Sequence, residues 1–337
     1  MLVPFPLAAD ATFALLLLWL ALAAWVVGAR LHHDRHQARR EHDARLLEGG
    51  ADPAGWRRGR LERVAHGAPG RGAGVAGWEL VRRDSRRLRR RARERSFRRT
   101  QALRVLTRGG WPLAFGLLRA AVANGSPDVR AAVVAIAAEH EGPDADALLL
   151  DVLVGGAHPR SRTATELTPR APRLVRELDE LATHEEPDVR YWALMLLREA
   201  AADPRAKAAA VAASTDPVAT VRGAAARLLG ASRDGDAQHV VRALLGDDVF
   251  YVRAHAARAA GDIGAEHLAE DVAALLADTS WWVRAAAKES LLVLGESGLA
   301  AATAMIHDDD RFARDGAMEV VSAFRRLPHA VPAELAG

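Results

Sequence analysis

A Val-Arg pair recurs in this 337-residue chain at a nearly constant interval, about 31 residues, which lies in the range of helical-repeat units. Five clear copies read PDVRAAV (127–133), PDVRYWA (187–193), ATVRGAA (219–225), FYVRAHA (250–256) and WWVRAAA (281–287). Weaker copies are FRRTQAL (97–103), PRSRTAT (159–165) and RFARDGA (311–317). The arginines of the eight copies are Arg99, Arg130, Arg162, Arg190, Arg222, Arg253, Arg284 and Arg314. Such a steady period predicts an array of repeats, and a pair of helices is the natural unit at this length.

Six of the eight copies have the residue spacing of an amphipathic helix. In these copies small or apolar residues precede the arginine by one position and follow it by three and seven, which places them on one helix face. Gly264 and Gly295 each stand three helical turns past their arginine, where a glycine commonly ends a helix. Pro127, Pro187 and Pro217 suit the first turn of a helix. The chain is rich in Ala and Leu and only 5% aromatic, which also favours an all-α fold.

These copies make residues 96–326 resemble the HEAT-repeat superfamily, particularly the short HEAT-like repeats first associated with phycobilisome lyases. The resemblance implies an α-solenoid of about seven to eight helix pairs. It also implies that the repeat arginines are structural and pair with an aspartate of a neighbouring turn. The candidate aspartates are Asp128, Asp188, Asp216, Asp248, Asp278 and Asp309. The resemblance is specific for fold and says little about function, because such solenoids serve unrelated tasks.

Residues 11–29 form a run of 19 residues without charge, which predicts a transmembrane helix of roughly 28 Å at ~1.5 Å per residue. A cleavable signal peptide would require basic residues before the run, and residues 1–10 contain none. Arg30, Arg35 and three further arginines follow it, so the positive-inside rule predicts an extracytoplasmic N-terminus (1–10) and a cytoplasmic solenoid. The predicted location is the cell membrane, with a single pass. Residues 327–337 are a C-terminal tail.

Residues 30–95 form a basic juxtamembrane region. Residues 1–104 contain 22 Lys+Arg against 10 Asp+Glu, whereas residues 105–337 contain 24 against 33. Gly49–Gly77 is rich in Gly and Pro and predicts a flexible linker. The run from Arg82 to Arg99 contains 11 arginines, and three interpretations stay open: anionic lipid, nucleic acid, or a solvated helix in an arginine-rich protein. The candidate lipid or nucleic-acid residues are Arg82, Arg83, Arg86, Arg87, Arg89, Arg90, Arg91 and Arg93.

Aromatic residues are scarce, yet several stand at matching points of successive repeats. Phe250, Tyr251, Trp281, Trp282 and Phe312 stand just before the arginine in three consecutive repeats, and Tyr191 and Trp192 lie nearby in an earlier repeat. Trp and Tyr favour interfaces because they combine a large contact area with a polar group. We therefore consider these residues candidates for protein binding, with packing inside the array as the alternative.

No catalytic, cofactor or metal site is predicted. The chain has no cysteine, and it has no P-loop, dinucleotide fingerprint, nucleophile elbow or H-E-x-x-H motif. Deoxyhypusine hydroxylase is a HEAT-repeat enzyme that binds iron through His-Glu pairs. Here His140-Glu141 and His184-Glu185 fall near helix ends or turns, so its site is not reproduced.

The sequence thus favours a membrane-anchored scaffold that binds anionic lipid and protein partners, with a membrane enzyme among the candidate partners. One alternative is a nucleic-acid-binding membrane protein that uses Arg82–Arg99. The other is a HEAT-type enzyme, similar either to a bilin lyase or to a metal hydroxylase.

Overall fold

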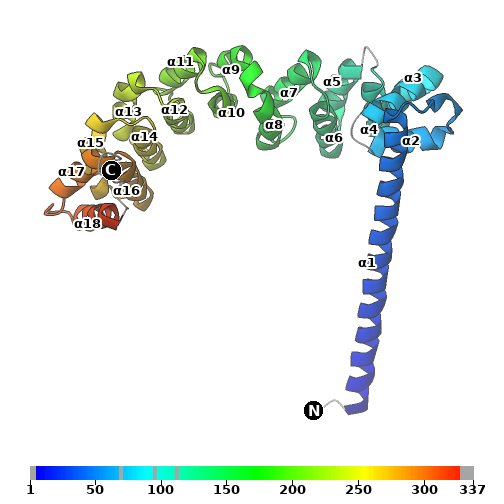
Figure 1. The fold of residues 1–337 in the computed structure, drawn as a ribbon, viewed down its shortest axis with the longest axis horizontal. Coiled ribbons are helices and arrows are strands. Elements are labelled where there is room, and N and C mark those ends of the chain that lie inside the picture. The colour runs from blue at the N-terminus through cyan, green and yellow to red at the C-terminus, as the bar shows by residue number, and fades with distance from the viewer. Residues whose placement is uncertain (1–4, 68–70, 94–96, 111–113, 327–337) are drawn as a thin grey trace, which may run out of the picture. The chain divides into compact units, whose positions relative to one another are not determined.

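The computed structural model describes residues 5–67, 71–93, 97–110 and 114–326. All regular secondary structure in these ranges is helical, which confirms the all-α prediction (Figure 1). The predicted C-terminal tail and the first four residues of the predicted N-terminal segment lie outside the described residues. The chain divides into two compact units, Met1–Leu148 (unit 1) and Leu149–Gly337 (unit 2).

Unit 1 begins with the 44-residue helix α1 (Phe5–Glu48), which continues without interruption through the run 11–29 and the histidine-rich residues after it. Among the described residues, no helix reaches the combination of length and hydropathy expected of a membrane span. The further helices are α2 (Arg58–Gly67), α3 (Arg71–Ala92), α4 (Phe97–Arg108), α5 (Ala114–Asn124) and α6 (Pro127–Ala138). A short 3-10 turn, η1 (Pro53–Gly55), precedes α2, and α7 (Pro143–Gly155) contains the boundary with unit 2.

In the region predicted to be a flexible linker, most of the residues that the structure describes are helical. Within 49–77 the chain forms η1, all of α2 and the start of α3, and Leu61, Val64 and Ala76 are fully buried. The glycines serve close helix packing here: a Cβ at Gly72 would lie 2.3 Å from the carbonyl oxygen of Ala44 on α1. The end of α1 is therefore part of the core of unit 1.

Unit 2 consists of consecutive helix pairs, followed by a single closing helix. The pairs are α8 (Arg160–Leu167) with α9 (Val175–Leu181), α10 (Pro187–Leu197) with α11 (Pro204–Ala213), α12 (Ala219–Ser232) with α13 (Gln238–Leu245), α14 (Phe250–Asp262) with α15 (Ala269–Ala274), and α16 (Trp281–Val293) with α17 (Gly295–Ala304). The closing helix is α18 (Arg311–Arg326). The short 3-10 helices are η2 (Thr168–Arg173), η3 (Arg198–Ala200), η4 (Gly235–Ala237), η5 (Glu266–Leu268) and η6 (Leu275–Ala277).

The pairs of unit 2 stack as a solenoid. Each first helix contacts the first helix of the next pair, through α10, α12, α14, α16 and α18, and the second helices α9 and α11 contact each other likewise. Figure 1 shows the first and second helices following opposite edges of this unit. The valines before the repeat arginines are fully buried between them, as are the alanines three residues after the arginines. No pair could bury these faces alone, so the stacking itself forms the core.

Several local details follow from residue type. Pro127 and Pro187 begin α6 and α10 as expected, but α12 begins at Ala219, so Pro217 lies before the helix. Gly264 and Gly295 have φ values of +65° and +64° just after α14 and α16, where a side chain would be strained. Pro169 and Pro172 fall in η2, which ends α8 early.

A ladder of arginine–aspartate pairs joins successive repeats of unit 2. Arg222 Nε and Nη2 bind Asp247 at 2.6 and 2.9 Å, and Arg253 binds Asp278 at 2.7 and 3.0 Å in the same two-pronged way. Arg190 binds Asp216 likewise. The Asp247 side chain is 7% exposed and that of Arg222 is 17% exposed, so water screens the pair little.

Each aspartate is also tied to its own repeat. The Asp247 carboxylate accepts a hydrogen bond from the backbone N–H of Val249. The backbone carbonyl of Asp247 accepts a hydrogen bond from Nη1 of Arg253 at 2.7 Å. Burial alone would raise the pKa of Asp247, but the hydrogen bonds from Arg222 and Val249 outweigh burial and hold this pKa below its ordinary value. One aspartate thus connects the arginines of two successive repeats into a continuous polar chain.

The ladder confirms Asp216 and Asp278 as partners and corrects the other predictions. Asp247, rather than Asp248, meets Arg222, because the residue that accepts the N–H two positions onward is also the one turned toward the preceding arginine. In the last repeat Asp308, rather than Asp309, makes the corresponding turn, with Asp310 N–H. Asp128 is exposed and Asp188 is 73% exposed, the latter 3.5 Å from Arg160.

The repeat arginine of α8 is Arg160, not Arg162. Arg160 donates to the carbonyls of Leu153 and Val154 and binds Glu186 at 2.8 Å, whereas Arg162 is exposed. With Arg160 in this role the repeat becomes more regular, because Arg130, Arg160 and Arg190 are equally spaced along the chain.

Candidate functional site

The aromatic side chains predicted to bind a partner lie at the starts of the first helices of unit 2. We name them the aromatic row: Tyr191, Trp192, Phe250, Tyr251, Trp281, Trp282 and Phe312. Phe250, Trp281 and Phe312 are the first or second residues of α14, α16 and α18, whereas Tyr191 and Trp192 stand one turn further along α10. Residues one turn apart on a helix lie on nearly the same face. Tyr191 and Trp192 therefore lie on the same side of their helix as the other aromatic residues do on theirs.

Exposure varies along the aromatic row. Trp281 and Trp282 are 60% and 59% exposed and form an edge-to-face pair with ring centroids 4.9 Å apart. Phe250 and Phe312 are also exposed, while Tyr191, Trp192 and Tyr251 are half-buried. Tyr251 lies against Gly223 of the preceding repeat, and Arg284 places its guanidinium 4.2 Å from the ring centre of Phe312. Packing therefore explains part of the row, but it does not explain why both tryptophans face solvent.

Ion pairs between neighbouring first helices form a second row, further along these helices than the aromatic residues. A basic side chain on one helix pairs with a glutamate that stands one repeat later, on the next first helix. In unit 2 these pairs are Arg258 with Glu289, at 3.1 Å, and Lys288 with Glu319. The same spacing occurs in unit 1, where Arg108 binds Glu139 at 2.6 Å. We refer to these contacts as the interhelix pairs.

The interhelix pairs are interrupted between α12 and α14. Arg227 on α12 would require a glutamate at the corresponding position of the next repeat, but that position is Arg258. Instead, Arg227 donates to the imidazole of His255, at 3.1 Å from Nε2. Burial, followed by the charges of Arg227, Arg258 and Arg198, lowers the pKa of His255 to about 4, so this imidazole is neutral at pH 7.

A cavity of about 300 Å³ opens at this interruption. Its charged and polar lining consists of Arg198, Arg227, His255, Arg258 and Asp262. Of the three guanidinium groups, that of Arg258 is already paired with Glu289. Among the residues that the structure describes, neither Arg198 nor Arg227 has a carboxylate partner. The sequence prediction missed these residues. The signal that could have found them is Arg227 and Arg258, both five positions after their repeat arginines, with no glutamate following Arg227 at the next repeat.

In unit 1 the arginines predicted to bind lipid or nucleic acid lie on α3, which is kinked at Asp84, apart from Arg93, which directly follows the end of this helix. Glu79, 1% exposed, binds Arg82 at 2.7 Å and also Arg83, and these contacts lower its pKa to about 2. Arg83 additionally donates to the carbonyls of Pro53, Ala54 and Trp56 and so holds η1 against α3.

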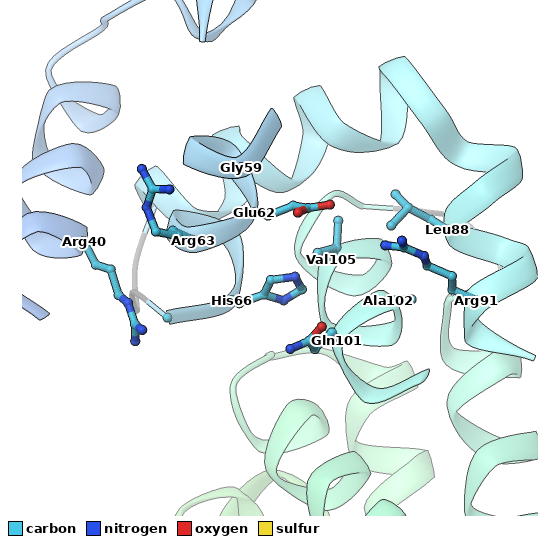
Figure 2. Close-up of a pocket in the computed structure, with 11 residues that line it drawn as sticks. Arg40, Gly59, Glu62, Arg63, His66, Leu88, Arg91, Gln101, Ala102 and Val105 are labelled. Carbon is cyan, nitrogen blue, oxygen red and sulfur yellow. The ribbon is translucent and has the colours of Figure 1, made fainter. Parts of the chain in front are cut away.

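The remaining arginines of α3 differ in exposure. Arg86, Arg87, Arg90 and Arg93 are exposed, whereas Arg89 and Arg91 are half-buried. Arg91 lines a cavity of about 320 Å³ together with residues of α1, α2 and α4 (Figure 2). Figure 2 shows Glu62 and His66 beside this arginine. Glu62 supplies a carboxylate to the cavity, and burial lowers the pKa of His66 to about 4. This cavity therefore contains both signs of charge.

Among the described residues, no group of three or more His, Asp or Glu side chains is arranged to hold a metal ion. His184, one of the histidines considered for iron, lies in the loop before α10, where its Nδ1 accepts the backbone N–H of Glu186.

The stacked helix pairs and the regular ladder define a helical-repeat protein. Residues 211–292 match the family model of HEAT repeats, which confirms the resemblance over this stretch. No curated protein matches the chain.

Solved structures that are similar to the chain include an engineered protein (16% identity, TM-score 0.40, 85% of this chain and 91% of the other). They also include YibA of Escherichia coli (17%, 0.44, 74% and 96%) and human deoxyhypusine hydroxylase in complex with glycerol (17%, 0.32, 75% and 98%). At these identities and TM-scores, the likenesses carry no argument about function.

Proposed function

We propose that this chain is a membrane-anchored scaffold that binds a protein partner through the aromatic row of unit 2. The observation that carries the proposal is the solvent-exposed pair of Trp281 and Trp282 at the start of α16. Exposed tryptophans cost solubility, and they are enriched among residues that dominate binding energies at interfaces. The repeat ladder supports their use for binding because it holds successive helix starts at fixed intervals.

The proposed anchor is the run 11–29 within α1. Its support is the absence of charge over the whole run and the exposure of the apolar side chains that the structure describes there, among them Trp19, Leu22 and Trp25. Arginines follow the run and none precedes it, which supports a cytoplasmic location for the remainder of the chain. We further propose that Arg86, Arg87, Arg90 and Arg93, which are exposed on α3 or directly after it and are not among the arginines bound to Glu79, contact anionic lipid.

The partner is tested by crosslinking the full chain in native membranes and identifying the captured protein. Replacing Trp281 and Trp282 with Ala is expected to reduce capture of that protein at least about tenfold, because buried interface tryptophans commonly contribute 2 kcal/mol or more. Trp78→Ala removes a tryptophan of similar exposure, 56%, from α3 of unit 1, and it should leave capture unchanged. Equal capture by the folded double variant and the unaltered chain would refute the aromatic row as a docking site.

In this proposal the chain binds and does not catalyse. Purified full chain should therefore contain no stoichiometric metal, and one iron per chain would contradict the proposal in favour of a hydroxylase-like enzyme. Retention of the chain on RNA or DNA at salt concentrations that release it from anionic vesicles would instead favour the nucleic-acid alternative.

A further inference from the structure

The pocket of Arg198, Arg227, His255 and Arg258 lies on the same helix faces as the aromatic row. On α14, Tyr251, His255 and Asp262 are four and seven residues apart, which places them along one face. On α12, Gly223 stands one turn before Arg227, and a Cβ at Gly223 would lie 3.6 Å from the Tyr251 ring and 3.4 Å from the His255 ring. Tyr251 of the aromatic row therefore adjoins the pocket.

The positive charges of the pocket are not fully matched by acidic residues of the chain itself. The interhelix pairs place a glutamate opposite each basic residue at the α14–α16 and α16–α18 steps, through Glu289 and Glu319. At the α12–α14 step the same position is Arg258, whose own charge is met by Glu289, so Arg227 has no glutamate opposite it. Guanidinium groups in a cavity favour a carboxylate or phosphate, which they can bind in a two-pronged geometry.

The surroundings favour a single acidic group over a polyanion. Residues 105–337 contain 33 acidic against 24 basic residues, so a nucleic acid would meet a net negative surface beyond the pocket. The cavity of about 300 Å³ accommodates one acidic side chain, and the adjoining aromatic residues provide contact area for apolar neighbours of that side chain.

We infer that the pocket of Arg198, Arg227, His255 and Arg258 binds an aspartate or glutamate side chain of an otherwise largely uncharged segment of the protein partner. The inference rests on the proposed function, because the same segment would contact the aromatic row. The carboxylate supplies the counter-charge that the repeat lacks at this step. His255, kept neutral by its burial and by the surrounding arginines, accepts the hydrogen bond from Arg227 and so helps to position that guanidinium.

The test is a selection of random peptides displayed on phage against the purified full chain in detergent. Peptides selected by the unaltered chain should be enriched in Asp or Glu at one position among apolar residues. That enrichment should be lost with Arg227→Gln/Arg258→Gln and with the milder Arg198→Gln. Arg205→Gln, which removes an exposed arginine of α11, should keep it.

The outcomes separate the two proposals. Selected peptides without acidic enrichment, or enrichment that persists in the pocket variants, would overturn the pocket and leave the scaffold proposal standing. No selected peptides at all would contradict both. A thermal melt of each variant monitors folding, and Arg198→Gln removes a guanidinium for which no hydrogen bond or ion pair is found among the described residues.

A second measurement tests the anion directly with glutarate, a small dicarboxylate, and with inorganic phosphate. The NMR titration of His255 in the full chain should show its pKa rising by about one unit in saturating glutarate, because a bound anion favours the protonated imidazole. Glutarate should leave the ring resonances of the exposed His239 and His267 unchanged. An equal rise in Arg227→Gln/Arg258→Gln would overturn the pocket, as would a response to phosphate alone.

Discussion

In unit 2 the repeat arginines Arg190, Arg222 and Arg253 each meet one carboxylate of the following repeat in the same two-pronged geometry. In unit 1, by contrast, α3 carries a dense arginine run in which one buried carboxylate, Glu79, serves both Arg82 and Arg83. Several other arginines of that helix are exposed. Periodic arginines with matched aspartates therefore stabilise the fold, whereas the exposed arginines of a clustered run remain available for a partner.

The strongest test of the ladder is Asp247→Ala. It leaves Arg222 partly buried without its carboxylate and the Val249 N–H without its acceptor, so we expect unfolding to become easier by roughly 2–4 kcal/mol. Urea unfolding of the full chain in detergent, followed by far-UV circular dichroism, measures this change. Asp248→Ala is the matched control. The Asp248 side chain is exposed, so its removal should change the free energy of unfolding by less than about 0.5 kcal/mol. Similar losses for the two variants would disprove the register of the ladder.

The exposed arginines of α3 are expected to give the next largest effect, on membrane preference instead of stability. Replacing Arg86, Arg87, Arg90 and Arg93 with Gln should weaken the preference for vesicles containing phosphatidylserine over phosphatidylcholine vesicles by about 2 kcal/mol, or roughly thirtyfold. Partition of the detergent-solubilised chain between the two vesicle types measures this preference. A control with four exposed arginines elsewhere changed to Gln should keep it; these are Arg57, Arg176, Arg205 and Arg311. An equal loss in the control would mean that overall charge, and not α3, sets the preference.

A smaller effect tests which arginine belongs to the α8 repeat. Arg160→Ala removes the bonds to the carbonyls of Leu153 and Val154 and to Glu186, which should cost about 1–2 kcal/mol of stability. Arg162→Ala should cost less than about 0.5 kcal/mol, because that side chain is exposed. Chemical denaturation of the two single variants side by side decides the matter, and a larger loss for Arg162→Ala would restore the register predicted from sequence.

The sequence predicted the all-helical fold because that fold depends on a recurring local pattern, and the resemblance to HEAT repeats implied the arginine–aspartate pairing. It misplaced single residues, such as Asp248 for Asp247, since adjacent aspartates look alike until the turn before the helix is known. The linker prediction failed for a related reason: the glycines at 49–77 permit flexibility in a free chain but permit close packing when α1 is available as a neighbour.

The candidate site was predicted unevenly. Most of the aromatic row could be proposed directly because rare residue types stood just before the arginine in three consecutive repeats. The pocket of Arg198, Arg227, His255 and Arg258 could not, because its character depends on which acid is missing from a neighbouring helix. That absence becomes visible only after the interhelix pairs, such as Arg258 with Glu289, are known.

The last rung of the ladder differs from the others. Arg284 keeps its two backbone acceptors, Asp278 and Thr279, but its outer side meets the ring of Phe312 where earlier arginines meet a carboxylate. An aromatic face attracts a cation less strongly than a carboxylate does and leaves its charge uncompensated. The interaction of the repeat arginine with the following repeat is therefore weaker between α16 and α18 than between earlier first helices. Amide protons of α18 should be the earliest in unit 2 to exchange with deuterium, so that the array frays from its C-terminal end inward.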